Sequence, residues 1–158
     1  MITLICVGKL KEKALRTLCD EYLKRLGRYS AVREIEVPDL PEPDRASDRE
    51  REALLLEEGR RILKRVGPRD HVTALCVEGS WRDSLSLSAQ LAGQRDRGAS
   101  DAVFIIGGSL GLSAEVKARA NERLSLSPMT FPHGLARLVL LEQLYRAHKI
   151  IAGERYHK

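Results

Sequence analysis

The chain has 158 residues, of which 43% are hydrophobic and 31% are charged, and its 27 basic and 22 acidic residues give a formal net charge of +5. This length fits one domain with a single core, and the composition excludes a disordered chain. No apolar run approaches the roughly 18 residues of a membrane-spanning helix, and the modest basic excess permits a polyanionic partner without requiring one.

The N-terminus and the cysteines indicate a cytoplasmic protein. The first apolar run precedes the basic residues of MITLICVGKLK, which is the reverse of a secretory signal. Cys6, Cys19 and Cys76 cannot all pair and form no C-x-x-C motif, so we expect reduced thiols. The four histidines show no metal-ligand spacing, and we expect no metal site.

The first part of the chain alternates strand and helix patterns. ITLICVG (2–8) is nearly continuous in apolar residues, which is typical of a strand buried on both faces of a parallel sheet. Apolar residues recur at helical spacing over 10–27. VREIEV (32–37) alternates strictly and predicts a strand with one solvent-facing side near the sheet edge, before the Pro-rich linker 38–48.

The rest of the chain repeats this alternation. Apolar spacing and turn residues predict a helix over 48–66, a strand over 71–79, a helix over 84–98 begun by a serine cap, a strand over 101–108, a short helix from Ser113, a strand over 123–127 and a helix from about 134 to about 152. Trp81 is expected to be half-buried. Five strands and five helices in this order predict a single α/β domain over 1–158, with a mostly parallel sheet flanked by helices.

A glycine-rich turn is the first candidate for a ligand site, because ligands of open α/β sheets bind beyond the carboxyl ends of the strands. IIGGSLGLS (105–113) places Gly107, Gly108 and Gly111 at such an end, where glycines let a ligand reach the backbone. The turn lacks the lysine of a P-loop and the spacing of G-x-G-x-x-G, which disfavours phosphate or dinucleotide binding. The alternative is a tight turn that packs a helix on the sheet.

A proline-rich loop is the second candidate. In LSLSPMTFPHG (124–134), Pro128 and Pro132 restrict the backbone, so a rigid loop can recognise a ligand through its peptide groups. The alternative is a stiff connector that places Met129 and Phe131 in the core.

The final helix is apolar over more than one face and must be buried on more than one side. An isologous dimer interface explains this surplus better than the chain's own sheet does. Arg146 on this helix is a candidate functional residue, and the alternative for it is an i,i+4 ion pair with Glu142.

Four motifs occur together and in one order: VGKLKEK (7–13), FIIGGSLGLS (104–113), LSLSPMTFPHGLARLVLLEQLYRAHKI (124–150) and YHK (156–158). In this combination the chain resembles the ribosomal large subunit methyltransferase H family, of the SPOUT class of RNA methyltransferases, over essentially its whole length. The resemblance implies an S-adenosylmethionine-dependent enzyme that methylates N3 of a pseudouridine in large-subunit ribosomal RNA. The few basic residues on so small a protein disfavour tight binding of naked RNA, so we expect the assembled ribosome or subunit as the substrate and no DNA partner.

The resemblance also implies a homodimer and a deep C-terminal trefoil knot over about 100–158, which is an exception to the rule against threaded connections. The cofactor would lie in this knot. The residues implied to contact it are Leu75, Gly107, Gly108, Leu126, Ser127, Pro128, Met129, Thr130 and Phe131.

The catalytic residues implied by the resemblance are Arg146 and the tail residues Tyr156, His157 and Lys158, with the tail closing over the partner subunit's active site. Lys158 stands where some family members carry arginine, and lysine keeps the charge but loses the bidentate fork. The alternative is a frayed, solvated chain end. His133 could serve as the base for the weakly acidic N3–H, but we favour a structural role for it, as a helix cap or a hydrogen-bonding group in the knot.

Two other functions compete with methyl transfer. The basic excess and the basic tail also suit a noncatalytic RNA-binding α/β module. A nucleotide- or flavin-binding domain could use the glycine turn, but the missing phosphate fingerprint disfavours it.

Overall fold

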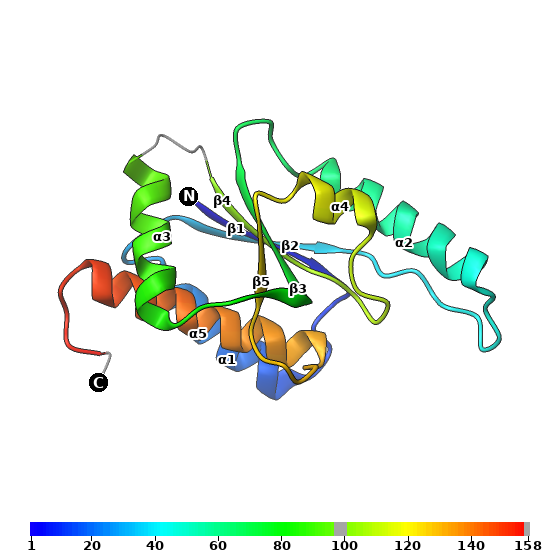
Figure 1. Ribbon diagram of the computed structural model, residues 1–158. Coiled ribbons are helices and arrows are strands. Elements are labelled where there is room, and N and C mark those ends of the chain that lie inside the picture. The colour runs from blue at the N-terminus through cyan, green and yellow to red at the C-terminus, as the bar shows by residue number, and fades with distance from the viewer. Residues whose placement is uncertain (97–100, 157–158) are drawn as a thin grey trace.

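The computed structural model describes residues 1–96 and 101–156, and within them the chain forms one parallel sheet flanked by helices (Figure 1). The strands are β1 (Ile2–Val7), β2 (Val32–Val37), β3 (His71–Trp81), β4 (Ala102–Ile106) and β5 (Glu122–Ser125). The helices are α1 (Lys13–Leu26), α2 (Asp48–Leu63), α3 (Ser84–Asp96), α4 (Ala114–Arg119) and α5 (His133–Ile151). The strand order is β2-β1-β4-β3-β5, and every neighbouring pair is parallel.

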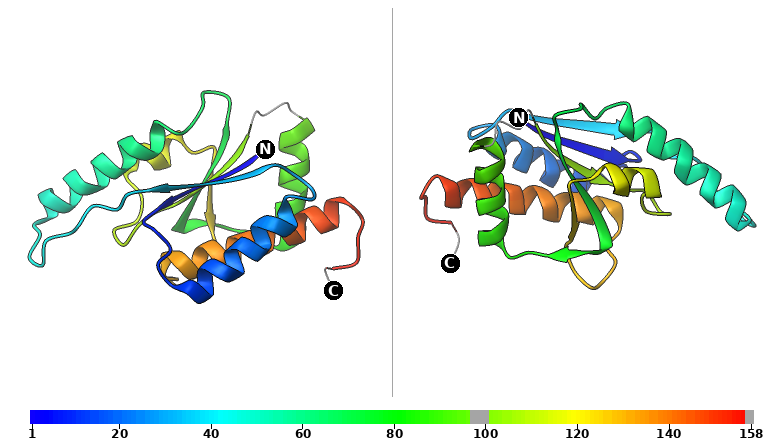
Figure 2. Two further views of the ribbon diagram at one scale, coloured as in Figure 1. Left: turned by 180° about the vertical axis from the view of Figure 1, so that it is seen from behind. Right: turned by 45° about the horizontal axis from the view of Figure 1, so that its top comes forward.

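The sheet separates two apolar cores, and Figure 2 shows the helices that cover each face. On one face α1, α3 and α5 pack over buried side chains that include Leu4, Phe104 and Leu141. On the other face α2 and α4 cover a cluster that includes Ile5 and Ile105. Because β1 and β4 contribute to both cores, their sequences are continuously apolar, as expected of strands covered on both faces.

The predicted elements are confirmed, with shifts at their ends. Ser47 and Glu50 form a capping box at the start of α2, which ends at Leu63 rather than at residue 66. The serine cap expected for α3 is wrong, because the Asp83 carboxylate accepts the Ser86 N–H at 2.7 Å. Residues 97–98, the end of the helix predicted there, lie outside the described residues. Among the helices that the structure describes, none is long and apolar enough to cross a membrane.

β3 contains an irregularity that the sequence did not predict. Leu75 and Ser80 both lie opposite Leu124 of β5, so the intervening residues 76–79 leave the regular pairing. Gly79 permits this, since an added Cβ would lie 2.6 Å from the Leu124 carbonyl carbon. The strand therefore continues to Trp81, whose 68% exposure contradicts the half-buried position expected for it.

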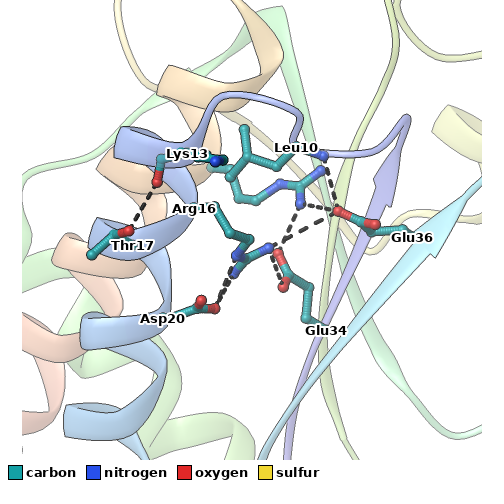
Figure 3. A network of polar contacts seen from close by, with 8 residues as sticks. Leu10, Lys13, Arg16, Thr17, Asp20, Glu34 and Glu36 are labelled. Carbon is teal, nitrogen blue, oxygen red and sulfur yellow. Dashed lines mark hydrogen bonds and ion pairs between the residues drawn. The ribbon is translucent and has the colours of Figure 1, made fainter.

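A buried ion network joins α5 to the sheet edge. Arg137 of α5 is fully buried, and its Nη1 donates to Glu34 at 2.9 Å and to Glu36 at 2.7 Å. Its Nη2 donates to the Gly8 carbonyl at 3.1 Å. Figure 3 shows Arg16 of α1 pointing toward the same two carboxylates, with Nη1 at 2.8 Å from Glu34. The network thus ties α1, α5 and the end of β1 to β2.

This network corrects one expectation. β2 is an edge strand, as predicted, but the side that carries Glu34 and Glu36 is only partly open to solvent, because arginines of α1 and α5 pair with both carboxylates and leave 14% and 31% of these side chains exposed. α5 itself packs between α1 and α3 and fully buries Leu140 and Leu144, so the chain covers part of its apolar surface.

The network predicts a pH-dependent loss of stability on replacing its central cation. Arg137→Met removes the buried cation that bridges Glu34 and Glu36 and leaves them only their contacts with Arg16, so it should lower the free energy of unfolding by about 3–5 kcal/mol at pH 7, measured by urea denaturation. Burial opposes ionisation of Glu36, but hydrogen bonds from Arg137 and the Leu10 N–H hold its pKa below the ordinary value. A depressed carboxyl pKa stabilises the fold above its unfolded-state pKa, so the deficit should shrink as the pH falls below about 4.

Arg33→Met is the matched control, because Arg33 is exposed on the same strand and has no ion pair within the described residues. Its effect should stay within about 0.5 kcal/mol. Equal losses in both variants, or a deficit that does not depend on pH, would contradict a stabilising network.

Candidate active site

A cavity of about 350 Å³ opens at the carboxyl ends of β3, β4 and β5. Three segments of the chain line it: the irregular stretch of β3 from Leu75 to Glu78, the glycine-rich loop 106–112 and the segment 124–131. Lys117 of α4 and His133 of α5 complete the wall. The cavity therefore lies where parallel sheets bind their ligands.

The glycine-rich loop doubles back on itself at the cavity wall. Gly111 has a φ of +83°, its N–H donates to the Gly108 carbonyl at 3.1 Å, and the two residues form an isolated bridge. A Cβ on Gly107 would lie 2.4 Å from the Gly111 carbonyl oxygen, so no larger residue fits without moving the loop. The three glycines of the loop thus line the cavity with backbone alone.

The proline-rich loop is held by its own serines. The Ser125 hydroxyl donates to the Ser127 carbonyl at 2.9 Å, and the Ser127 hydroxyl accepts the Met129 N–H at 3.0 Å. Met129 is 74% exposed at the cavity and Phe131 is half-buried there, so Met129 is not a core residue as the connector alternative required. The loop therefore offers apolar side chains together with a constrained backbone.

Sequence reasoning missed several residues of the cavity, among them Lys117 and Cys76. The ammonium of Lys117 forms an ion pair with the Glu78 carboxylate, and this contact holds the pKa of Glu78 below its ordinary value. Lys117 lies on the short helix α4, and its partner Glu78 lies in the irregular stretch of β3, so no local sequence pattern joins the two. Within the described residues, no cluster of histidine, cysteine and carboxylate side chains could hold a metal ion.

Most of the residues expected to contact the cofactor border this single cavity. They are Leu75, Gly107, Gly108, Leu126, Ser127, Met129, Thr130 and Phe131. Pro128 belongs to the same loop but is not part of the cavity wall. His133 also lines the cavity; it is the first residue of α5, and no side chain caps that helix, so the capping role favoured for His133 is not observed.

Arg146 and Tyr156 lie together, away from the cavity. The Glu142 carboxylate accepts hydrogen bonds from Arg146 Nη2 at 2.6 Å and from the Tyr156 hydroxyl at 3.2 Å. The Arg146 guanidinium lies 4.7 Å from the centre of the Tyr156 ring, and burial is the main cause that raises the pKa of Tyr156 to about 12. The i,i+4 pair weighed for Arg146 is thus present, while His157 and Lys158 lie outside the described residues.

The cavity combines three kinds of surface. Leu75, Leu126 and Met129 offer apolar contacts for a flat ring, the two loops offer peptide groups, and the Glu78–Lys117 pair offers charges of both signs. A nucleoside that carries a zwitterionic amino acid has all the complementary groups. The volume of the cavity, about 350 Å³, is within the range of small-molecule sites.

Known proteins are similar to this chain over nearly its whole length. Residues 1–157 match a family described as "Predicted SPOUT methyltransferase". The chain is similar to proteins named ribosomal RNA large subunit methyltransferase H, with 50% identity over 157 residues to the one from Exiguobacterium sibiricum and 52% to one from Streptococcus thermophilus. Each match covers 99% of both chains.

The fold also has a counterpart among solved structures. A probable methylase family protein from Haemophilus influenzae superposes with a TM-score of 0.57 over 99% of this chain and 70% of its own. The two sequences are only 11% identical, so this likeness concerns the fold alone.

The glycine loop yields a test with a single added methyl group. Gly107→Ala forces the loop apart at the cavity wall and should weaken S-adenosylmethionine binding at least about tenfold, or 1.4 kcal/mol, in isothermal titration calorimetry. Gly27→Ala is the control, because its Cβ would lie 3.4 Å from the nearest atom, the Lys24 carbonyl oxygen, at the end of α1. Undiminished binding by a folded Gly107→Ala protein would remove this loop from the cofactor site.

Proposed function

Because the chain belongs to the ribosomal RNA large subunit methyltransferase H family of SPOUT methyltransferases, we propose that it methylates N3 of a pseudouridine in large-subunit ribosomal RNA. SPOUT methyltransferases use S-adenosylmethionine as the methyl donor. The observation that supports this function most strongly is that one cavity gathers eight of the nine residues expected to contact that donor.

We assign the cofactor to the cavity between the glycine loop and the proline loop. Leu75 and Leu126 offer apolar surface to the adenine, and the close packing of Gly107 on Gly111 leaves the backbone accessible to the donor. The Glu78–Lys117 pair can meet the ammonium and carboxylate groups of the methionine part. All of these groups are in place within one chain.

The reaction depends more on how the methyl donor and the N3 nucleophile are oriented than on a strong acid or base. S-adenosylmethionine supplies a methyl carbon bonded to a positively charged sulfur, and transfer breaks that S–C bond while forming the N3–C bond. The two stiff loops would hold the donor so that the nucleophile approaches in line at about 3–3.5 Å. His133 lies at the cavity wall, next to the proline loop, where its imidazole can accept the N3 proton.

The tail residues act, in this proposal, on the cavity of a second copy. Arg146 and Tyr156 are held by Glu142 outside their own cavity, so a homodimer in which the tail reaches across would give them access to substrate. Leu18 of α1 is 48% exposed and Leu135 of α5 is 37% exposed, and both helices could carry the dimer contact. His157 and Lys158 would extend this contribution.

The path of the chain supports a knot. We infer a knotted cofactor domain over about 100–158 within the single domain 1–158. In support, the chain leaves edge strand β5 and returns as α5 against interior strand β4.

The substrate would be RNA in the assembled ribosome, and the enzyme would therefore act in the cytoplasm. Few basic side chains border the cavity, which favours a preassembled particle over naked RNA.

The function is tested by radiolabelled methyl transfer from S-adenosylmethionine to ribosomes from cells that lack the modification. We expect label at N3 of a single pseudouridine, and at least about tenfold less transfer to the isolated RNA. Ribosomes that already carry the methyl group are the control. Labelling of protein instead of RNA, or no transfer to any ribosomal particle, would contradict the proposed activity.

The tail is tested by removing residues 155–158. Calorimetry should find S-adenosylmethionine affinity unchanged within about twofold, while methyl transfer falls by about 100-fold or more because catalytic contacts are lost. Mixing this truncated protein with Gly107→Ala protein should restore part of the activity, since a mixed dimer keeps one intact cavity facing one intact tail. Full activity of the truncated protein alone, or no recovery on mixing, would contradict a tail that acts across the dimer.

A further inference from the structure

The loop between β1 and α1 borders the candidate active site. Residues 8–12 line a second hollow of about 470 Å³ together with residues 132–135 at the start of α5. His133 lines both this hollow and the cofactor cavity. A Cβ on Gly8 would lie 3.6 Å from the His133 ring, so the loop and the histidine are direct neighbours.

The backbone of this loop is fixed by the buried network. Gly8 turns the chain with a φ of +86°, donates its N–H to the Val37 carbonyl at 2.8 Å and receives Arg137 Nη2 at its carbonyl. The Leu10 N–H donates to Glu36 at 3.1 Å (Figure 3). The peptide groups on both sides of Lys9 are therefore anchored to β2 and α5.

This fixed backbone carries two exposed lysine side chains. Lys9 and Lys11 are exposed and border the hollow, and neither forms an ion pair within residues 1–96 and 101–156, whereas Arg16, Lys117 and Arg137 are all paired there. Lys13 follows at the exposed start of α1. The acidic side chains that border the same hollow are Glu12 and Asp39.

We propose that Lys9 and Lys11 bind phosphate groups of the RNA strand that carries the target nucleotide. The proposal rests on the function proposed above. A base that enters the cofactor cavity past His133 leaves its sugar-phosphate backbone at the rim of the cavity. Residues 8–12, here called the lysine loop, form that rim on the side of β1. Flexible ammonium groups on a rigid loop supply charge without reading sequence, so the loop positions the strand while the cavity selects the base.

The test compares Lys9→Ala/Lys11→Ala with Arg60→Ala/Lys64→Ala in methyl transfer to unmodified ribosomes. Arg60 of α2 and Lys64, the residue that follows this helix, are exposed on the opposite face of the sheet from α1 and have no ion pair within the described residues. The lysine-loop variant should raise the KM for ribosomes about tenfold at low salt and reduce the slope of log KM against log salt concentration by about 2. Its kcat and its affinity for S-adenosylmethionine should stay within about twofold of the wild type.

Two further comparisons separate the effect of the lysine charge from that of side-chain shape, and the phosphate site from the proposed methyl transfer. Lys9→Arg/Lys11→Arg keeps both charges and should retain the wild-type KM within about twofold. An unchanged KM in the alanine variant, an equal rise in the α2 control, or a loss of S-adenosylmethionine binding would each overturn the phosphate site. Wild-type protein that binds S-adenosylmethionine yet methylates no ribosomal particle would instead refute the proposed function, and the lysine site with it.

Discussion

The site depends on the position of β3 between β4 and β5. Leu75 lies opposite Ile106 on one side and opposite Leu124 on the other, so the regular part of β3 ends beside the ends of β4 and β5, and the segments that follow meet at one edge. Beyond Leu75 the pairing with β5 is interrupted until Ser80, and the intervening residues turn toward the opening rather than continuing the sheet. Glu78 lies in this unpaired stretch and forms an ion pair with Lys117 of α4. The irregular stretch therefore supplies the charged part of the cavity, while the glycine and proline loops supply its backbone walls.

The Arg137 network performs a second task, which is to hold the start of α5 against the N-terminal strands. α5 follows directly from the proline loop, so any movement of this helix moves one wall of the cavity. The guanidinium contacts two carboxylates of β2 and the carbonyl that ends β1, and these segments lie more than a hundred residues earlier in the chain. Burying such a cation is costly unless all its partners are present, which makes the arrangement specific to one packing of α5. The same network fixes the exposed lysine loop, so the cavity wall and the proposed RNA contact share one support.

Local patterns in the sequence were sufficient to identify the elements and the two loops, because apolar runs, glycines and prolines act within a few residues. The family resemblance added the cofactor and the proposal that the tail acts on a partner's cavity. Neither source predicted what depends on pairing between distant segments: the strand order, the irregular stretch 76–79 and the burial of Arg137. Glu34 and Glu36 illustrate the reason, since alternation marked them as solvent-facing and only the packing of α1 and α5 places arginines against them. Tyr156 is similar, because its contact with Glu142 requires the tail to fold back along α5.

The central claim is that two stiff loops at the carboxyl edge of the sheet hold the methyl donor. A crystal structure of the protein grown with saturating S-adenosylmethionine tests this most directly. The account predicts density for the whole donor between the glycine loop 106–112 and the proline loop 126–131, with its adenine beside Leu75. Density for the donor elsewhere on the molecule, or an empty cavity at saturating donor, would contradict it.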